Sequence, residues 1–152
     1  MKIVCIAPDD LSALLFFKTL SRLLAQRDGI ELVTIGGPVE GQSADMYSNE
    51  IRKEIISTHI EILMKRFISP VQDMVYLFRL YRILKSEQCQ AVITFTTKPN
   101  IYGQIAAFLA RVPLRVMAVR GLGRTFNAPA TFKEHLLQQL MTVLYRSACR
   151  IA

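Results

Sequence analysis

The chain has 152 residues, of which 51% are hydrophobic and 20% are charged. This length suits one domain with a single core, and this apolar content excludes a disordered chain, because too much apolar surface would stay in water. The formal net charge of +7 is unevenly spread: residues 1–60 carry −2 and residues 61–152 carry +9. The basic part favours an anionic partner (nucleic acid, a phosphorylated ligand or a membrane) over a merely solvated basic face.

The apolar residues are not grouped as in a membrane span or a secretion signal. No 18 consecutive residues are apolar, and Asp9 and Asp10 interrupt the first apolar run. We therefore expect a cytoplasmic protein. Cys5, Cys89 and Cys149 lack the spacing of a metal site, and each lies in or beside an apolar run typical of a strand. All three are expected to be buried free thiols in a reducing compartment.

Strand-like and helix-like segments alternate along the chain. Short apolar runs rich in β-branched residues predict strands at 2–7, 31–35, 59–64, 91–96 and 115–119. Apolar residues at helical spacing predict helices over about 12–27, 70–87, 99–111 and 131–146. A loop and a short helix are expected over 39–58. Residues 149–152 have the composition of a strand cut short, which indicates a fragment of something longer.

This alternation predicts a Rossmann-like α/β fold. Strand–helix–strand crossovers give a doubly wound, mostly parallel sheet with helices on both faces. Ligands of such sheets bind beyond the carboxyl ends of the strands. The segments expected at that edge are 8–12, 36–37, 96–100 and 120–126.

The common motifs of cofactor and metal sites are missing. Gly121 and Gly123 have the spacing of a dinucleotide loop, but Phe126 stands where its third glycine belongs and the turn follows the fifth strand. A phosphate-binding GxxxxGK[ST] loop is also absent. His59 and His135 are the only histidines and form no HExxH, so we expect no metal site and no cofactor bound by this chain.

Asp9 and Asp10, after the first strand, have two interpretations. Carboxylates favour the N-terminal end of a helix, so they can cap the helix near Ser12. Together with Lys98, after the fourth strand, they also match a phosphoacceptor receiver module. That alternative needs a third carboxylate after the middle strand, which residues 62–69 do not supply, since Asp73 lies inside the following helix.

The second half carries a more specific series of motifs. A Ser69-Pro70 helix start is followed by a KPxxYGxxAA segment over 98–107 and then by Gly121-Leu122-Gly123. From about Ile56 to Arg150 this series resembles the N-terminal domain of family 4 glycosyltransferases of the GT-B fold. The resemblance is to bacterial enzymes that build O-antigen, capsule and other lipid-linked glycans.

The resemblance implies a retaining transferase with two Rossmann-like domains. Residues 1–152 are then the single acceptor-side domain, and the C-terminal domain that binds most of the UDP- or GDP-sugar donor is absent from this chain. The acceptor implied is a polyprenyl-diphosphate-linked glycan, with no role for nucleic acid. A natural half-enzyme that needs a separate C-terminal chain is a further alternative.

The chain departs from the family at three places. Many members have His-x-His where this chain has Thr94-Phe95-Thr96, and histidine where it has Arg120. A glycine-rich turn common after the first strand is replaced by Pro8-Asp9-Asp10. No catalytic residue is therefore assigned.

Candidate ligands for the acceptor or a phosphate group come from the expected sheet edge. Pro99 suits a first helical turn, whose free amides together with a lysine favour an anion, and arginines beside glycines suit bidentate phosphate contacts. The candidates are Asp9, Asp10, Ser12, Lys98, Asn100, Arg120, Gly121, Gly123 and Arg124.

A second group of basic residues lies in and before the helix over 70–87. These residues are either the solvated side of a core helix or a face that docks on anionic lipid at the inner face of the cytoplasmic membrane. They are Lys65, Arg66, Arg79, Arg82 and Lys85.

Overall fold

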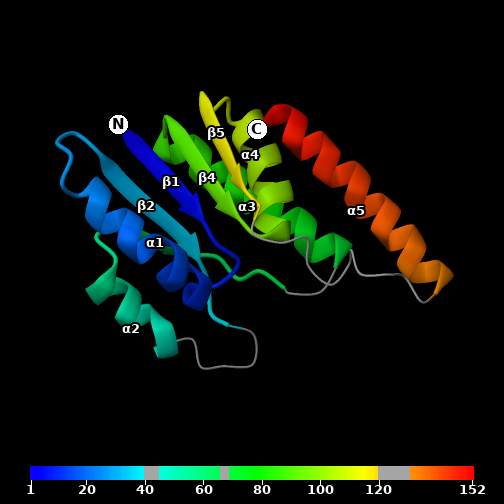
Figure 1. Cartoon of the computed structure of the whole chain (residues 1–152), viewed down its shortest axis with the longest axis horizontal. Helices are drawn as coiled ribbons and strands as arrows, with labels where there is room; N and C mark the ends of the chain where they lie inside the picture. The colour runs from blue at the N-terminus through cyan, green and yellow to red at the C-terminus, as the bar shows by residue number, and fades with distance from the viewer. Residues whose placement is uncertain (40–44, 66–68, 120–130) are drawn as a thin grey trace.

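A computed structural model describes residues 1–39, 45–65, 69–119 and 131–152 (Figure 1). Strands and helices alternate along these residues as predicted. In chain order they are β1 (Lys2–Ile6), α1 (Asp10–Leu24), β2 (Glu31–Gly36), α2 (Asp45–Glu54), β3 (Thr58–Glu61), α3 (Pro70–Glu87), β4 (Ala91–Phe95), the π-helical turn η1 (Pro99–Gly103), α4 (Gln104–Leu109), β5 (Leu114–Ala118) and α5 (Phe132–Ile151).

The strands form one parallel sheet in the order β3-β2-β1-β4-β5. This order is that of a Rossmann fold, with the chain reversing its direction across the sheet between β1 and β4. The predicted doubly wound fold is thus confirmed. The receiver-like alternative is wrong, because in flavodoxin-like sheets, to which receivers belong, the first strand lies between the second and third and not beside the fourth.

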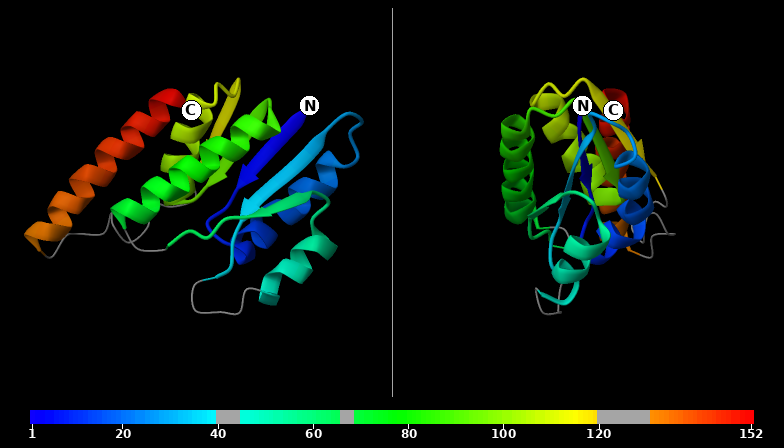
Figure 2. Two further views of the ribbon diagram at one scale, coloured as in Figure 1. Left: turned by 180° about the vertical axis from the view of Figure 1, so that it is seen from behind. Right: turned by 90° about the vertical axis from the view of Figure 1, so that its left-hand side faces the viewer.

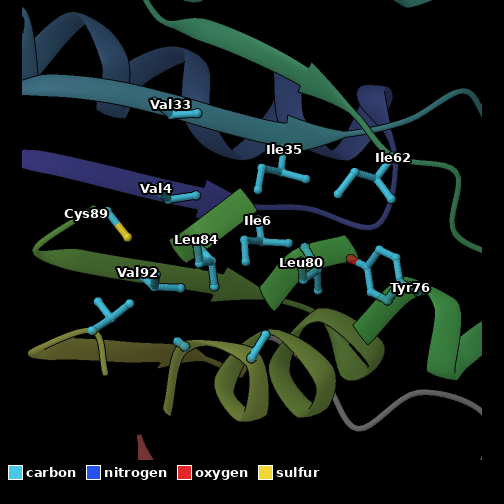
Figure 3. Close-up of a cluster of buried hydrophobic side chains, with 13 residues drawn as sticks. Val4, Ile6, Val33, Ile35, Ile62, Tyr76, Leu80, Leu84, Cys89 and Val92 are labelled. Atoms are coloured by element: carbon cyan, nitrogen blue, oxygen red, sulfur yellow. The ribbon is translucent and has the colours of Figure 1, made fainter. Parts of the chain in front are cut away.

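Helices cover both faces of the sheet (Figure 2). Val4, Ile6 and Val92 point towards α3 and α4, and pack with Leu80 and Leu84 of α3 (Figure 3). The alternate strand residues point to the other face, where α1 and α2 cover them; examples are Ile3, Cys5 and Leu32. From Ile3 to Ile6 both faces of β1 are apolar and buried, as a central parallel strand requires.

Local features of the sequence shape α3 and η1, and the predicted start of α3 is confirmed. Pro70 occupies the start of α3, directly after Ser69, and Gln88 ends that helix in the left-handed conformation, with φ 48°. Gly103 lets η1 approach the sheet, because a Cβ atom there would lie 2.8 Å from Cγ2 of Thr94.

The last residues of the chain correct two predictions, the strand at 149–152 and the burial of Cys149. Residues 149–151 are the final turn of α5, and Cys149 is exposed. Apolar residues at helical spacing continue through Met141, Tyr145 and Ala148, all of which are buried, so the helix propagates beyond Arg146. A run of four residues is too short to show any period, which is why its composition was misleading.

We predict that the three thiols differ sharply in reactivity. Burial raises the pKa of Cys5 to about 12 and that of Cys89 to about 11, so neither forms the reactive thiolate at neutral pH. Ellman's reagent should modify one thiol per native chain, and all three in guanidinium. Cys149→Ser should leave the native chain unreactive; rapid modification of that variant would contradict the burial of the other two.

Candidate functional site

The carboxyl edge of the sheet gathers polar residues from the ends of β1, β2, β3 and β4. Asp9 caps α1, because its Oδ1 accepts a hydrogen bond from the backbone N–H of Ser12 at 2.7 Å. The capping interpretation is therefore confirmed for Asp9. It does not extend to Asp10, which is the first residue of the helix and turns inward.

Asp10 is buried, with 1% of its surface exposed. Its backbone N–H donates to the carbonyl of Gly37 at 2.8 Å, and its Oδ1 lies 3.2 Å from Nε2 of His59. Gly36 makes this approach possible, since a Cβ atom there would stand 2.7 Å from the same Oδ1. The second oxygen, Oδ2, is buried without a hydrogen-bond partner.

The other side of the His59 ring is held by hydroxyl groups. Nδ1 lies 2.9 Å from Oγ1 of Thr34, its register partner on β2, and that oxygen lies 3.0 Å from Oγ of Ser57. Glu61, two residues along β3, is exposed on the same face. Ligand atoms of Asp10, His59 and Glu61 all lie within 4.8 Å of one another.

This cluster was missed in the sequence. The available signal was the i, i+2 spacing of His59 and Glu61, which places both side chains on one face of a strand. Their closeness to Asp10 depends on the strand order, which puts β3 beyond β2 and brings the start of α1 over both. The spacing of residues within one strand does not show that Asp10 lies close to His59 and Glu61.

Lys98 does not lie open at the edge of the sheet as expected. It is 7% exposed, and its Nζ pairs with Oδ1 of Asp73 at 2.6 Å and donates to the carbonyl of Lys65 at 2.9 Å. Asp73 also accepts from the backbone N–H of Ser69, and from the hydroxyl of Tyr102. Lys98 therefore joins the segment after β4 to the start of α3. Burial, and secondly the Asp73 charge, raises the pKa of Tyr102 to about 12.

Asn100 is also turned into the interior. Its Oδ1 accepts from the hydroxyl of Thr94 at 2.8 Å, and its Nδ2 donates to the carbonyl of Ala118 at 3.1 Å and to the Tyr145 hydroxyl at 3.3 Å. These bonds tie β4, β5 and α5 together. Gln104 completes the network by donating to Thr94. Asn100 thus holds the fold at this edge, in place of the exposed position that the sequence suggested.

Four remaining edge candidates lie outside the described residues: Arg120, Gly121, Gly123 and Arg124. Arg66 of the basic group also lies outside them. The other members of that group, Lys65, Arg79, Arg82 and Lys85, are all exposed.

The outer side of α3 is both basic and apolar. We call it the α3 surface; its exposed residues are Val71, Met74, Val75, Phe78, Arg79, Arg82 and Lys85. The guanidinium carbon of Arg82 lies 6.0 Å from the centre of the Phe78 ring. An apolar groove of about 370 Å³ runs between α3 and α4, lined by Met74, Leu77, Phe78, Tyr81 and Leu109.

No family model matches the chain. It is 37% identical over 81 residues to a UDP-Gal:alpha-D-GlcNAc-diphosphoundecaprenol alpha-1,3-galactosyltransferase from Escherichia coli, covering 53% of this chain and 20% of that protein. It is 34% identical over 83 residues to the capsular polysaccharide biosynthesis glycosyltransferase CapM from Staphylococcus aureus, covering 55% of this chain and 20% of that protein. The chain is a homologue of bacterial glycosyltransferases.

Solved structures agree on the fold. A UDP-GlcNAc 2-epimerase from Neisseria meningitidis bound to UDP-GlcNAc matches 95% of this chain with a TM-score of 0.62 and 19% identity. The match covers 38% of the epimerase chain. A glycosyltransferase from Rickettsia africae matches 88% with a TM-score of 0.55 and 19% identity, over 32% of its chain. These are Rossmann-like domains of the GT-B type. This chain spans about a fifth of the length of the curated relatives that it matches.

We predict that Lys98 and Asp73 stabilise the fold as a pair. Lys98→Met should lower the free energy of unfolding by about 3 kcal/mol, because it leaves a carboxylate buried without its counter-charge. The double variant Lys98→Met/Asp73→Asn should lose less than the sum of the two single variants. Chemical denaturation of all four proteins measures this coupling, and strictly additive losses would show that the two groups act independently.

Proposed function

We propose that this chain is the acceptor-side domain of a bacterial glycosyltransferase that moves a sugar from a nucleotide sugar to a polyprenyl-diphosphate-linked glycan. The observation that carries the proposal is the sequence similarity of about half of the chain to two transferases, one of which is named for a diphosphoundecaprenol acceptor. The Rossmann-like sheet supports it, since this fold binds ligands at the carboxyl edge. The basic excess of residues 61–152 suits an anionic acceptor.

The exposed face of β5 on the α1 side supports the proposal that the complete enzyme is larger than this chain. Within the described residues β5 pairs with β4 alone, and Leu114 and Val116 on that face are 54% and 41% exposed. An apolar strand face of this kind is normally covered by a further element. The proposed complete enzyme adds such elements and a second domain that binds the nucleotide sugar.

We propose that the polar edge of the sheet faces the acceptor diphosphate. Asp9 and Ser12 use their capping groups within the fold, and Lys98 and Asn100 are turned inward, so the phosphate contacts are assigned to Arg120 and Arg124. The planar guanidinium groups of arginine match phosphate oxygens in a bidentate manner. Gly121 and Gly123 allow a close approach of the backbone.

We predict that the 152-residue chain alone transfers no sugar, because catalysis needs donor and acceptor held together. The complete enzyme should transfer a sugar from a UDP- or GDP-sugar to a polyprenyl-diphosphate glycan. In it, Arg120→Ala should lower kcat/KM at least tenfold, while Arg27→Ala, in the turn after α1, should not. Radiolabelled sugar transfer measures all three.

The length of the parent reading frame separates two forms of this proposal. A frame that continues into a second domain makes the chain part of a single enzyme. A frame that ends here makes it a half-enzyme, for which activity should appear on mixing with a separate donor-binding chain. A complete enzyme that transfers no sugar to any polyprenyl-diphosphate acceptor would contradict the proposal itself.

We further propose that the α3 surface docks on the anionic inner leaflet of the cytoplasmic membrane. No helix among the described residues is long and apolar enough to span a membrane. We assign the docking to exposed apolar side chains, chiefly Met74 and Phe78, and to the basic residues Arg79, Arg82 and Lys85. Each basic residue at such a surface contributes about 1 kcal/mol, and apolar side chains add to this by insertion.

We predict that the chain binds vesicles containing anionic lipid in a salt-sensitive manner and does not bind neutral vesicles. Replacing Lys65, Arg66, Arg79, Arg82 and Lys85 by glutamine should abolish binding in a sedimentation assay. Arg27, Arg52 and Lys53, near α1 and α2, provide a control, since their replacement by glutamine should leave binding unchanged. If the two sets of variants bind alike, the docking surface lies elsewhere.

A further inference from the structure

We propose that Asp10, His59 and Glu61 bind one divalent transition-metal ion at the carboxyl edge of the sheet. The three residues come from the start of α1 and from β3, and their ligand atoms lie within 4.8 Å of one another. An imidazole nitrogen with two carboxylates suits a borderline cation such as Zn²⁺. The proposal is independent of the transferase activity proposed above.

The geometry of Asp10 and His59 carries the proposal. Their Nε2 and Oδ1 atoms are 3.2 Å apart, at the long end of the range for N–H···O hydrogen bonds. Two ligand atoms of a tetrahedral zinc site, each about 2.0 Å from the metal, lie about 3.3 Å apart. The observed spacing therefore matches the edge of such a site before any side chain moves.

The unpartnered oxygen of Asp10 is a second, independent observation. Oδ2 is buried without a hydrogen-bond partner, in a side chain that is almost fully buried. A buried carboxylate oxygen without a partner costs free energy, and the nearby Glu61 carboxylate adds repulsion between like charges. A cation between the two carboxylates and the imidazole removes the repulsion, and coordination by both oxygens of Asp10 removes the first penalty as well.

The surroundings of His59 are those of a metal ligand. Nδ1 lies 2.9 Å from Oγ1 of Thr34, and the tautomer in which Nδ1 is the hydrogen-bond donor leaves the lone pair of Nε2 directed towards Asp10. Thr34 is fully buried and is held in turn by Ser57, so the ring orientation is fixed. Such a partner on the far nitrogen is typical of histidine ligands. Glu61 is exposed, so the remaining coordination positions open towards solvent and can take water or an anionic oxygen.

The test is zinc binding by the untagged, chelator-treated chain, measured by equilibrium dialysis. All proteins carry Cys149→Ser, because an exposed thiol is itself a zinc ligand. We expect one Zn²⁺ per chain. Since even the outer partners of metal ligands are worth about 10–100-fold in affinity, Asp10→Asn or His59→Gln should each weaken binding at least about 100-fold. Glu61→Gln should weaken it clearly without disturbing the fold, because this residue is exposed.

Two matched controls test the assignment. His135→Gln removes a histidine on α5, and Glu54→Gln removes a carboxylate on α2; neither should change the stoichiometry or the affinity. Circular dichroism of each variant verifies that it is folded. If Asp10→Asn does not fold, the exposed Glu61→Gln variant still decides the test. Absence of zinc uptake by the parent chain would overturn the proposal. So would equal zinc binding by the parent and the His59→Gln variant.

Discussion

A parallel sheet must be covered on both faces, and the rest of this structure depends on that requirement. Val4, Cys5 and Ile6 of β1 are completely buried, since α3 and α4 pack on one side and α1 and α2 on the other. The crossovers that bring these helices into place carry the chain from the carboxyl end of one strand to the amino end of the next. Every loop that follows a strand therefore meets the others at one edge.

Polar residues at that edge are used in two different ways. Lys98 and Asn100 are turned inward, where an ion pair and a hydrogen-bond network join β4, β5, α3 and α5. Asp10 and His59 face each other across β2, with one carboxylate oxygen unpartnered and Glu61 open to solvent. The β4 side of the edge is thus closed by its own contacts, while the β3 side keeps binding capacity.

The α3 surface shows how covering the sheet also shapes the outside of the molecule. Tyr76, Leu80 and Leu84 of α3 fill the core. The outer side of the same helix faces solvent, and there it carries Phe78, Arg79 and Arg82. An ordinary core helix carries mainly polar residues on that side. An apolar and basic exterior next to the groove with α4 is what the proposed docking on an anionic membrane requires.

The sequence by itself determined the alternation of strands and helices, and with it the parallel Rossmann-like sheet, because the periods of 2 and 3.6 are local properties of the chain. It also offered the cap at Asp9 as one of two interpretations, because capping depends on a few neighbouring residues. Only the tertiary structure decided the partners of Asp10, Lys98 and Asn100. Those partners, His59, Asp73 and Tyr145, lie 49, 25 and 45 residues away in the chain, and strand order brings them together. No spacing within one element encodes such contacts.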